Sequence, residues 1–195
     1  MGATIVAFGG EYPTIGRAVM LAPTATIVGR VRIEDEASVW FGAVVRAEFD
    51  QTVLGPRSVV EDNCVIHANT HLSEDVLVGH GAVVEDCIVG PRSVIGSGAV
   101  IVGDAEIGSD TMIAAGSVVL PGMRIPDGVL VAGNPASVKK ELSGASAEWV
   151  AVAARSYRQL ARGYMPDGLD PSIASELQAL AGQLRRGRSF GNAKS

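Results

Sequence analysis

Aliphatic side chains recur at every sixth position along most of this 195-residue chain. Three runs, at residues 27–45, 54–84 and 95–131, carry Ile, Leu or Val at each six-residue step. Four positions after the aliphatic residue, small side chains dominate, as at Ala37, Ala43, Ser58, Ala82, Ser93, Ala99, Ala105, Thr111 and Ser117. A fixed short period of this kind is the sequence signature of a repeat architecture.

We interpret each hexapeptide as one short strand and one corner, so that three of them form one coil of about 18 residues in a triangular prism. The aliphatic side chain fills the interior and the small residue fits the corner, while neighbouring coils hydrogen-bond at about 4.8 Å. The pattern from Ala25 to Ala136 predicts about six coils, which bury a core that no single repeat could bury. The predicted fold is an all-β solenoid, a parallel β-helix of hexapeptide repeats.

The six-residue register is interrupted twice. The step from Val45 to Leu54 is nine residues long, so residues 47–53 are expected to form a loop. The step from Val84 to Val89 is five residues long, which removes one residue from the repeat. Both interruptions flank histidines, and irregular segments on a rigid scaffold often carry function. Ordinary drift of the repeat is the alternative interpretation.

After the repeats the pattern becomes helical. Ser146 is suited to cap a helix over residues 147–162, whose apolar residues fall near one face, and Gly163 suits its C-terminal end. A second helix is predicted at residues 170–184, with Asp at the cap and Pro at the first position. The chain thus divides into a β-helix domain, a C-terminal helical extension and a disordered tail, at residues 1–136, 137–187 and 188–195.

Composition and charge narrow the choice of partners and compartment. The formal net charge of −5 gives no reason to expect nucleic acid or an anionic membrane as partner. No apolar run approaches the roughly 18 residues of a membrane-spanning helix. The N-terminal segment MGATIVAFGGEYP has no basic region and does not resemble a signal peptide. Cys64 and Cys87 are too few for a disulfide framework, so we expect a reducing, cytoplasmic location.

Three polar residues occupy the same position of their repeats. Arg46, His67 and Glu85 each follow an aliphatic residue, and the step from His67 to Glu85 is 18 residues, which is one full coil. These two side chains are therefore expected on one face of the prism, one rung apart. If the segment after Val45 is looped out, Arg46 lies one rung before His67, and the three residues form a column.

A second histidine of interest, His80, falls at the third position of its hexapeptide and on the preceding face. Within one prism it cannot easily meet His67, but across a subunit interface a neighbouring His80 could face His67 and Glu85. Two imidazoles and a carboxylate are suitable ligands for Zn²⁺ or another divalent metal. The alternative is that these histidines are structural, as we take His71 to be, because it has no partner in the column.

At these residues the sequence resembles the γ-class carbonic anhydrase family. The similar stretches are SVWFGAVVRAEF, VVEDNCVIHANT, VLVGHGAVVEDCIVG and VAGNPASVKK, at residues 38–49, 59–70, 76–90 and 131–140. The resemblance covers about residues 22–160. It implies a left-handed β-helix, a homotrimer, and one metal ion at each subunit interface, with Zn²⁺ as the expected metal and Fe²⁺ or Co²⁺ as alternatives. The handedness follows from the resemblance alone.

The resemblance also implies roles for single residues. His67 matches the first metal-binding histidine, and His80 matches the histidine that the adjacent subunit donates. Glu85 stands where the family has its third histidine ligand. Arg46 matches the arginine beside the site, and Asp62 matches the aspartate that pairs with it across the interface.

Three further departures from the family lie nearby. Glu48 replaces an aspartate, Ala47 replaces a glycine, and Glu61 replaces the glutamine that orients the metal-bound water. We expect Glu61 to accept a proton from that water. An anionic Glu85 among the ligands would raise the pKa of the bound water, so CO₂ hydration is expected to be weak or absent.

The sequence therefore favours a metal-dependent hydratase or hydrolase acting on CO₂, bicarbonate or a small ester or thioester. The residues expected to serve the reaction are Arg46, Glu48, Glu61 and Asp62, beside the metal ligands His67, His80 and Glu85. A non-catalytic trimer that binds a ligand or serves assembly is one alternative. A hexapeptide acyltransferase using acyl-CoA is another, which would need a catalytic histidine on an extruded loop. The sequence leaves open whether the protein is an enzyme.

Overall fold

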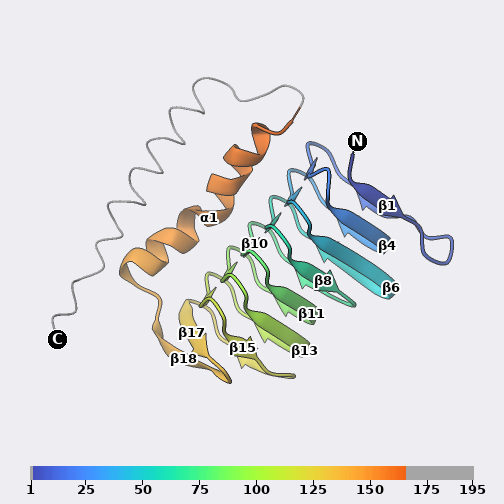
Figure 1. Cartoon of the computed structure of the whole chain (residues 1–195). Coiled ribbons are helices and arrows are strands. Elements are labelled where there is room, and N and C mark those ends of the chain that lie inside the picture. Colours follow the sequence, from blue (N-terminus) through green and yellow to red (C-terminus); the bar gives the residue numbers. More distant parts are fainter. Residues whose placement is uncertain (1, 166–195) are drawn as a thin grey trace.

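The computed structural model describes residues 2–165, which form a parallel β-solenoid of about seven turns with one helix along its side (Figure 1). The left-handed β-helix of hexapeptide repeats is confirmed. The first sheet contains ten strands: β1 (Thr4–Val6), β2 (Thr14–Ile15), β4 (Thr26–Ile33), β6 (Val44–Leu54), β8 (Val65–His67), β9 (His71–Leu72), β11 (Val83–Val89), β13 (Val100–Ile107), β15 (Val118–Val119) and β16 (Arg124–Ile125).

The second sheet runs along another face of the prism. It contains eight strands: β3 (Met20–Leu21), β5 (Ser38–Val39), β7 (Val59–Val60), β10 (Leu77–Val78), β12 (Val94–Ile95), β14 (Met112–Ile113), β17 (Val129–Gly133) and β18 (Ala136–Glu141). Neighbouring strands are parallel, apart from the antiparallel pair of β17 and β18. This last hairpin closes the second sheet at the end of the solenoid.

The aliphatic six-residue positions form the core, as the period predicts. Ile66 pairs with Val45 and Val84 of the adjacent coils, and Ile101 pairs with Val84 and Val119. All five side chains are fully buried, and so are the small residues four positions after the aliphatic ones. Stacking equivalent residues in register gives each coil apolar neighbours on both sides, which is how a solenoid stabilises repeats that could not fold alone.

Both register breaks lie where the sequence indicates. The first lies in β6, which pairs in register with β4 up to Ala47 and again from Thr52. Residues 48–51 have no partner in this ladder, so the irregular segment is shorter than the predicted loop. The second break shifts the register of β11 against β13 between Glu85 and Cys87.

The solenoid starts earlier than predicted. About seven turns are present instead of six, because residues before Ala25 also form strands. Strands β1 and β2 pair with β4, and β3 pairs with β5. The period is hard to detect there because a hairpin turn at Phe8–Glu11 interrupts the first coil.

The helix also begins earlier than predicted. Helix α1 spans Gly144–Arg162, and its N-cap residue is Ser143, whose side chain makes no capping hydrogen bond. The prediction that Ser146 is the cap is therefore wrong, because the chain turns directly from the β17–β18 hairpin into the helix. Gly163 follows the last turn, as predicted. The second predicted helix and the predicted disordered tail, at residues 170–184 and 188–195, lie outside the described residues.

Helix α1 runs back along the solenoid beside the second sheet (Figure 1). Its predicted apolar face is buried at Val150, Ala153 and Ala154, which pack against a group of apolar residues: Met20, Ala22, Trp40, Val59, Leu77 and Val94. The ring of Tyr157 packs edge-on against Trp40, with centroids 5.6 Å apart. No helix within residues 2–165 is long and apolar enough to cross a membrane.

Candidate functional site

The predicted column of polar residues is present. In the backbone ladder Arg46 of β6 pairs with His67 of β8, which pairs with Glu85 of β11. The side chains of His67 and Glu85 also meet, with Nδ1 and Oε1 3.4 Å apart. Residues 48–51 leave the ladder at the first break, and Arg46 therefore lies one rung before His67, as the nine-residue step predicts.

Glu48 completes this first cluster from the segment that leaves the ladder. Its Oε1 accepts a hydrogen bond from Nη1 of Arg46, and its Oε2 lies 3.2 Å from Nε2 of His67. Burial alone would raise the pKa of Glu48, but the hydrogen bond and charge of Arg46, together with His67, outweigh burial and lower it. Glu48 is therefore an anion at neutral pH and holds the His67 ring from the side opposite Glu85.

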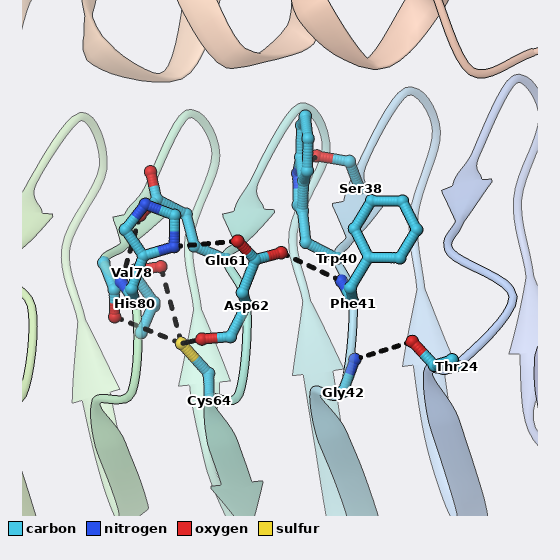
Figure 2. Close-up of polar contacts among 11 residues, drawn as sticks. Thr24, Ser38, Trp40, Phe41, Gly42, Glu61, Asp62, Cys64, Val78 and His80 are labelled. Atoms are coloured by element: carbon cyan, nitrogen blue, oxygen red, sulfur yellow. Dashed lines mark hydrogen bonds and ion pairs between the residues drawn. The ribbon is translucent and has the colours of Figure 1, made fainter.

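His80 belongs to a second cluster, shown in Figure 2. Its Nε2 lies 2.9 Å from Oε2 of Glu61, and its Nδ1 lies 3.2 Å from Oδ2 of Asp62. The backbone N–H of His80 also donates to Oε2 of Glu61, at 3.0 Å. Asp62 in turn accepts the backbone N–H of Phe41, at 3.1 Å. Both ring nitrogens of His80 thus face carboxylates of its own chain.

Glu61 is a buried carboxylate, with only 3% of its surface exposed. It lies beneath helix α1 beside Trp40 (Figure 2), and the hydroxyl of Tyr157 on that helix hydrogen-bonds to it. Burial raises the pKa of Glu61, although the hydrogen bond from Tyr157 and the nearby His80 oppose the rise. Burial next to Glu61 likewise raises the pKa of the Tyr157 hydroxyl, which stays a donor.

Sequence reasoning did not identify Tyr157 as part of this cluster. A signal was available, because a tyrosine on the buried face of a helix needs a partner for its hydroxyl. Cys64 also lies in this cluster (Figure 2), and burial raises the pKa of its thiol to about 12. The thiol therefore remains protonated and adds no thiolate to the site.

The seven predicted site residues fall into two separate clusters within one chain: Arg46, Glu48, His67 and Glu85, and Glu61, Asp62 and His80. Within residues 2–165, no group of three or more His, Cys, Asp or Glu side chains could hold a metal ion. Arg46 pairs with Glu48 in its own chain, and its predicted pairing with Asp62 across an interface remains a prediction. The separation of His67 from His80 agrees with the expectation that one prism cannot bring them together.

Comparison with known proteins connects this fold to two groups. Residues 86–121 match the bacterial transferase hexapeptide family (six repeats). The chain is 31% identical over 162 residues to γ carbonic anhydrase 2 of Arabidopsis thaliana mitochondria, covering 78% of this chain and 58% of the relative. The chain spans less than two thirds of the length of the curated relatives it matches first.

Two solved structures are similar over nearly their whole length. A hexapeptide transferase family protein from Anaplasma phagocytophilum is 30% identical with a TM-score of 0.80, and the match covers 83% of this chain and 98% of that one. A protein from Bacillus cereus described as a putative acetyltransferase is 28% identical with a TM-score of 0.69, covering 84% and 98% of the two chains.

Proposed function

Because this chain belongs to the hexapeptide-repeat family and is similar to γ carbonic anhydrases, we propose that it is a metal-dependent hydratase or hydrolase for a small substrate. The observation that carries the proposal is the distance of 3.4 Å between Nδ1 of His67 and Oε1 of Glu85. Two ligands of a tetrahedral zinc ion, each about 2.1 Å from the metal, lie about 3.4 Å apart. The spacing of this pair therefore suits a shared metal ion.

Glu48 supports this assignment of His67. Histidine ligands of metals usually donate their second ring N–H to a carboxylate, which fixes the ring and its tautomer. When Nε2 of His67 donates to Glu48, Nδ1 presents its lone pair beside Glu85. The charge of Arg46 keeps Glu48 anionic for this role.

We propose that a neighbouring copy supplies the third ligand, His80, in a homotrimer. No third donor is available beside His67 and Glu85 in the described part of one chain. Each ring nitrogen of His80 faces a carboxylate, Glu61 or Asp62. Ligation would therefore require one of these contacts to open, and the carboxylate that stays would orient the ring. A stable monomer at micromolar concentration in sedimentation would rule this arrangement out.

The bound metal would supply a Lewis acid that lowers the pKa of water at the site. Glu61 would accept the proton from that water, and burial, which raises its pKa, makes it a stronger base than an exposed glutamate. The anionic Glu85 reduces the effective positive charge of such a site, which disfavours CO₂ hydration. Ligand sets of two histidines and a carboxylate serve hydrolytic zinc enzymes, so an ester or thioester is the favoured substrate.

The experiment that tests the shared site is metal analysis of mixed trimers. His67→Ala and His80→Ala should each lose metal, whereas His71→Ala, which changes a histidine outside both clusters, should keep it. If the two deficient chains are co-expressed, each mixed trimer contains one interface at which an intact His67 meets an intact His80. Metal should then return to that interface. Failure to return, or full metal in His80→Ala alone, would show that the site is not shared.

A second measurement tests the role of Glu85. Glu85→His together with Glu61→Gln restores the residues that the γ carbonic anhydrase family has at these positions. The double variant should hydrate CO₂ faster than the wild type while binding metal fully. A wild type that already hydrates CO₂ efficiently would contradict the proposed effect of the carboxylate.

The similarity to the putative acetyltransferase supports a second candidate, transfer of an acyl group from acyl-CoA. None of residues 48–51, which leave the ladder beside the site, is histidine, so this segment does not supply the catalytic histidine that such an enzyme would need. Incubation with acetyl-CoA and an added amine acceptor distinguishes the two candidates, since a hydrolase releases free acetate and needs the metal, whereas an acyltransferase transfers the acetyl group to the amine without metal.

A further inference from the structure

A surface hollow of about 400 Å³ opens beside His67 and has walls of two kinds. One wall is polar and is formed by Arg46, Glu48, Asp50 and His67. The other is aromatic and consists of Phe8 and Phe49, whose rings meet edge to face with centroids 5.8 Å apart. The proposed metal ligand and an apolar surface therefore line the same depression.

The aromatic wall is held in place by polar contacts. Phe8 begins a tight turn in which the next two glycines have φ of +59° and +88°, and backbone hydrogen bonds of 3.0 Å join it to Glu11. Phe49 belongs to the 48–51 segment. Arg30 lies between them, because its Nη1 donates to the carbonyl of Phe49 at 3.2 Å and its Nη2 lies 3.7 Å from Oε1 of Glu11. One arginine thus ties together the two segments that carry the rings.

The exposure of these rings needs an explanation. Phe49 is 80% exposed and Phe8 is 41% exposed in the isolated chain, although a phenyl ring gains free energy when it leaves water. A substrate as small as CO₂ would not fill a hollow of this size, since pockets for small organic ligands begin at about 300 Å³. The apolar wall meets the polar wall at His67, and Glu85 lies outside the hollow, at the other nitrogen of that ring. This arrangement suits a molecule with an apolar tail on the rings and a reactive carbonyl end that passes His67.

We infer that Phe8 and Phe49 bind the apolar acyl chain of the substrate, which is then an ester or thioester of a medium-chain acid. This inference rests on the proposed function, because it assigns the reactive end to His67 and Glu85. In the reaction the oxygen of water forms a bond to the acyl carbon, and the bond from that carbon to the alkoxy oxygen or thiol sulfur breaks. One proton of the water ends on the leaving alcohol or thiol, and the acid is released.

The first arm of the test measures hydrolysis as a function of chain length. The probes are p-nitrophenyl acetate and p-nitrophenyl hexanoate, and the quantity compared is the ratio of their kcat/KM values. Each methylene buried on the wall should contribute about two- to fourfold, so the wild type should prefer hexanoate by at least tenfold. In the double variant Phe8→Ala/Phe49→Ala this ratio should fall to near one. Ile88→Ala removes a similarly exposed apolar side chain from β11 outside the hollow, and should leave the ratio unchanged.

The second arm measures binding without catalysis. Acetate and hexanoate are titrated calorimetrically into the full-length protein, and hexanoate should bind at least tenfold more tightly in the wild type but not in the double variant. If the esters are not hydrolysed but this binding preference is found, the proposed function is wrong, but the binding of an acyl chain by Phe8 and Phe49 is supported. If hexanoate shows no preference in either arm, the inference is wrong even when acetate is hydrolysed. A double variant that sediments as a smaller species than the wild type would show that the rings form a subunit contact, which also overturns the inference.

Discussion

His67 and His80 each lie between two carboxylates, but the surroundings of those carboxylates differ. Beside His67, Glu48 pairs with Arg46, and its pKa is lowered. Beside His80, Glu61 lies under helix α1 without an arginine or lysine among the groups that act on it, and burial raises its pKa. A carboxylate next to an arginine is fixed as an anion and can only hold its histidine. A buried carboxylate without a permanent cation nearby holds a proton more readily than an exposed one, so the proposed role in proton transfer belongs to the second cluster.

The largest predicted effect comes from a substitution that disturbs the first cluster and leaves the second intact. Gly29 has φ of +74°, and a Cβ there would lie 2.1 Å from the carbonyl oxygen of Ala47, directly before Glu48. Gly29→Ala should lower the free energy of unfolding by about 2–5 kcal/mol, from backbone strain and the clash. Gly116 is the matched control, because its φ is +67° and a Cβ added there would have no atom within 4 Å. Gly116→Ala should cost only about 1–2 kcal/mol, and denaturant titration measures both; equal costs would contradict the prediction.

The next effect concerns the second cluster. Tyr157→Phe removes the hydroxyl that donates to Glu61 and should cost about 1–3 kcal/mol of unfolding free energy, because a buried carboxylate loses a partner. The hydrogen bond lowers the pKa of Glu61, so its loss should raise that pKa. The limb of the pH–rate profile on which the rate rises with pH should then move to higher pH. Tyr164→Phe changes a more exposed tyrosine that also packs on Trp40, and should leave both quantities unchanged. An unshifted profile in Tyr157→Phe would show that Glu61 is not the base.

A smaller effect distinguishes the two clusters, because their contributions to the free energy of unfolding change with pH in opposite directions. The lowered pKa of Glu48 stabilises the folded protein above the unfolded pKa, and this contribution disappears as pH falls through the folded pKa. The raised pKa of Glu61 has the opposite consequence, because its contribution is present at low pH and disappears as pH rises through the folded pKa. Relative to the wild type, Glu48→Gln should therefore lose stability as pH rises from acid to neutral, whereas Glu61→Gln should gain it. Unfolding titrations across this range measure the two differences, and slopes of the same sign would refute the contrast.

The smallest effect sets the baseline for charged pairs outside both clusters. Arg92 pairs with Asp110 one rung away, with Nη2 and Oδ2 2.6 Å apart, and both side chains are about half exposed. Arg92→Ala should cost less than about 1 kcal/mol, and the cost should shrink further in high salt. A cost as large as that of Tyr157→Phe would mean that surface ladders of this kind stabilise the solenoid as strongly as the buried cluster does.

The period of the sequence was sufficient to predict the fold and the first column. A step of 18 residues places His67 and Glu85 on adjacent rungs whatever the details of packing, and the nine-residue step correctly indicated that Arg46 joins them. These relations are local to the repeat, so they depend only on counting residues. The resemblance supplied the handedness, which no count of residues contains.

Contacts between unlike elements could not be predicted in the same way. The bond of Tyr157 to Glu61 depends on where helix α1 docks, and the docking is decided by apolar packing on Trp40 and its neighbours. The approach of Phe8 to Phe49 depends on a hairpin turn and on the course of the 48–51 segment, neither of which follows the six-residue period. The sequence therefore predicted which residues stack on adjacent coils, but not the contacts that helix α1, the turn at Phe8 and the 48–51 segment make with other elements.

The return of helix α1 along the solenoid has a consequence for the order of folding. Trp40 and Glu61 lie in early coils, yet Tyr157, which covers them, comes about a hundred residues later in the chain. Neighbouring coils form contacts that are short in sequence and can assemble in succession, whereas a closure of this length is slow. During synthesis the first coils can therefore stack while Glu61 is still open to water, and its proton affinity should change only when the helix docks. The titration of this one carboxylate is thus a reporter of the docking of helix α1.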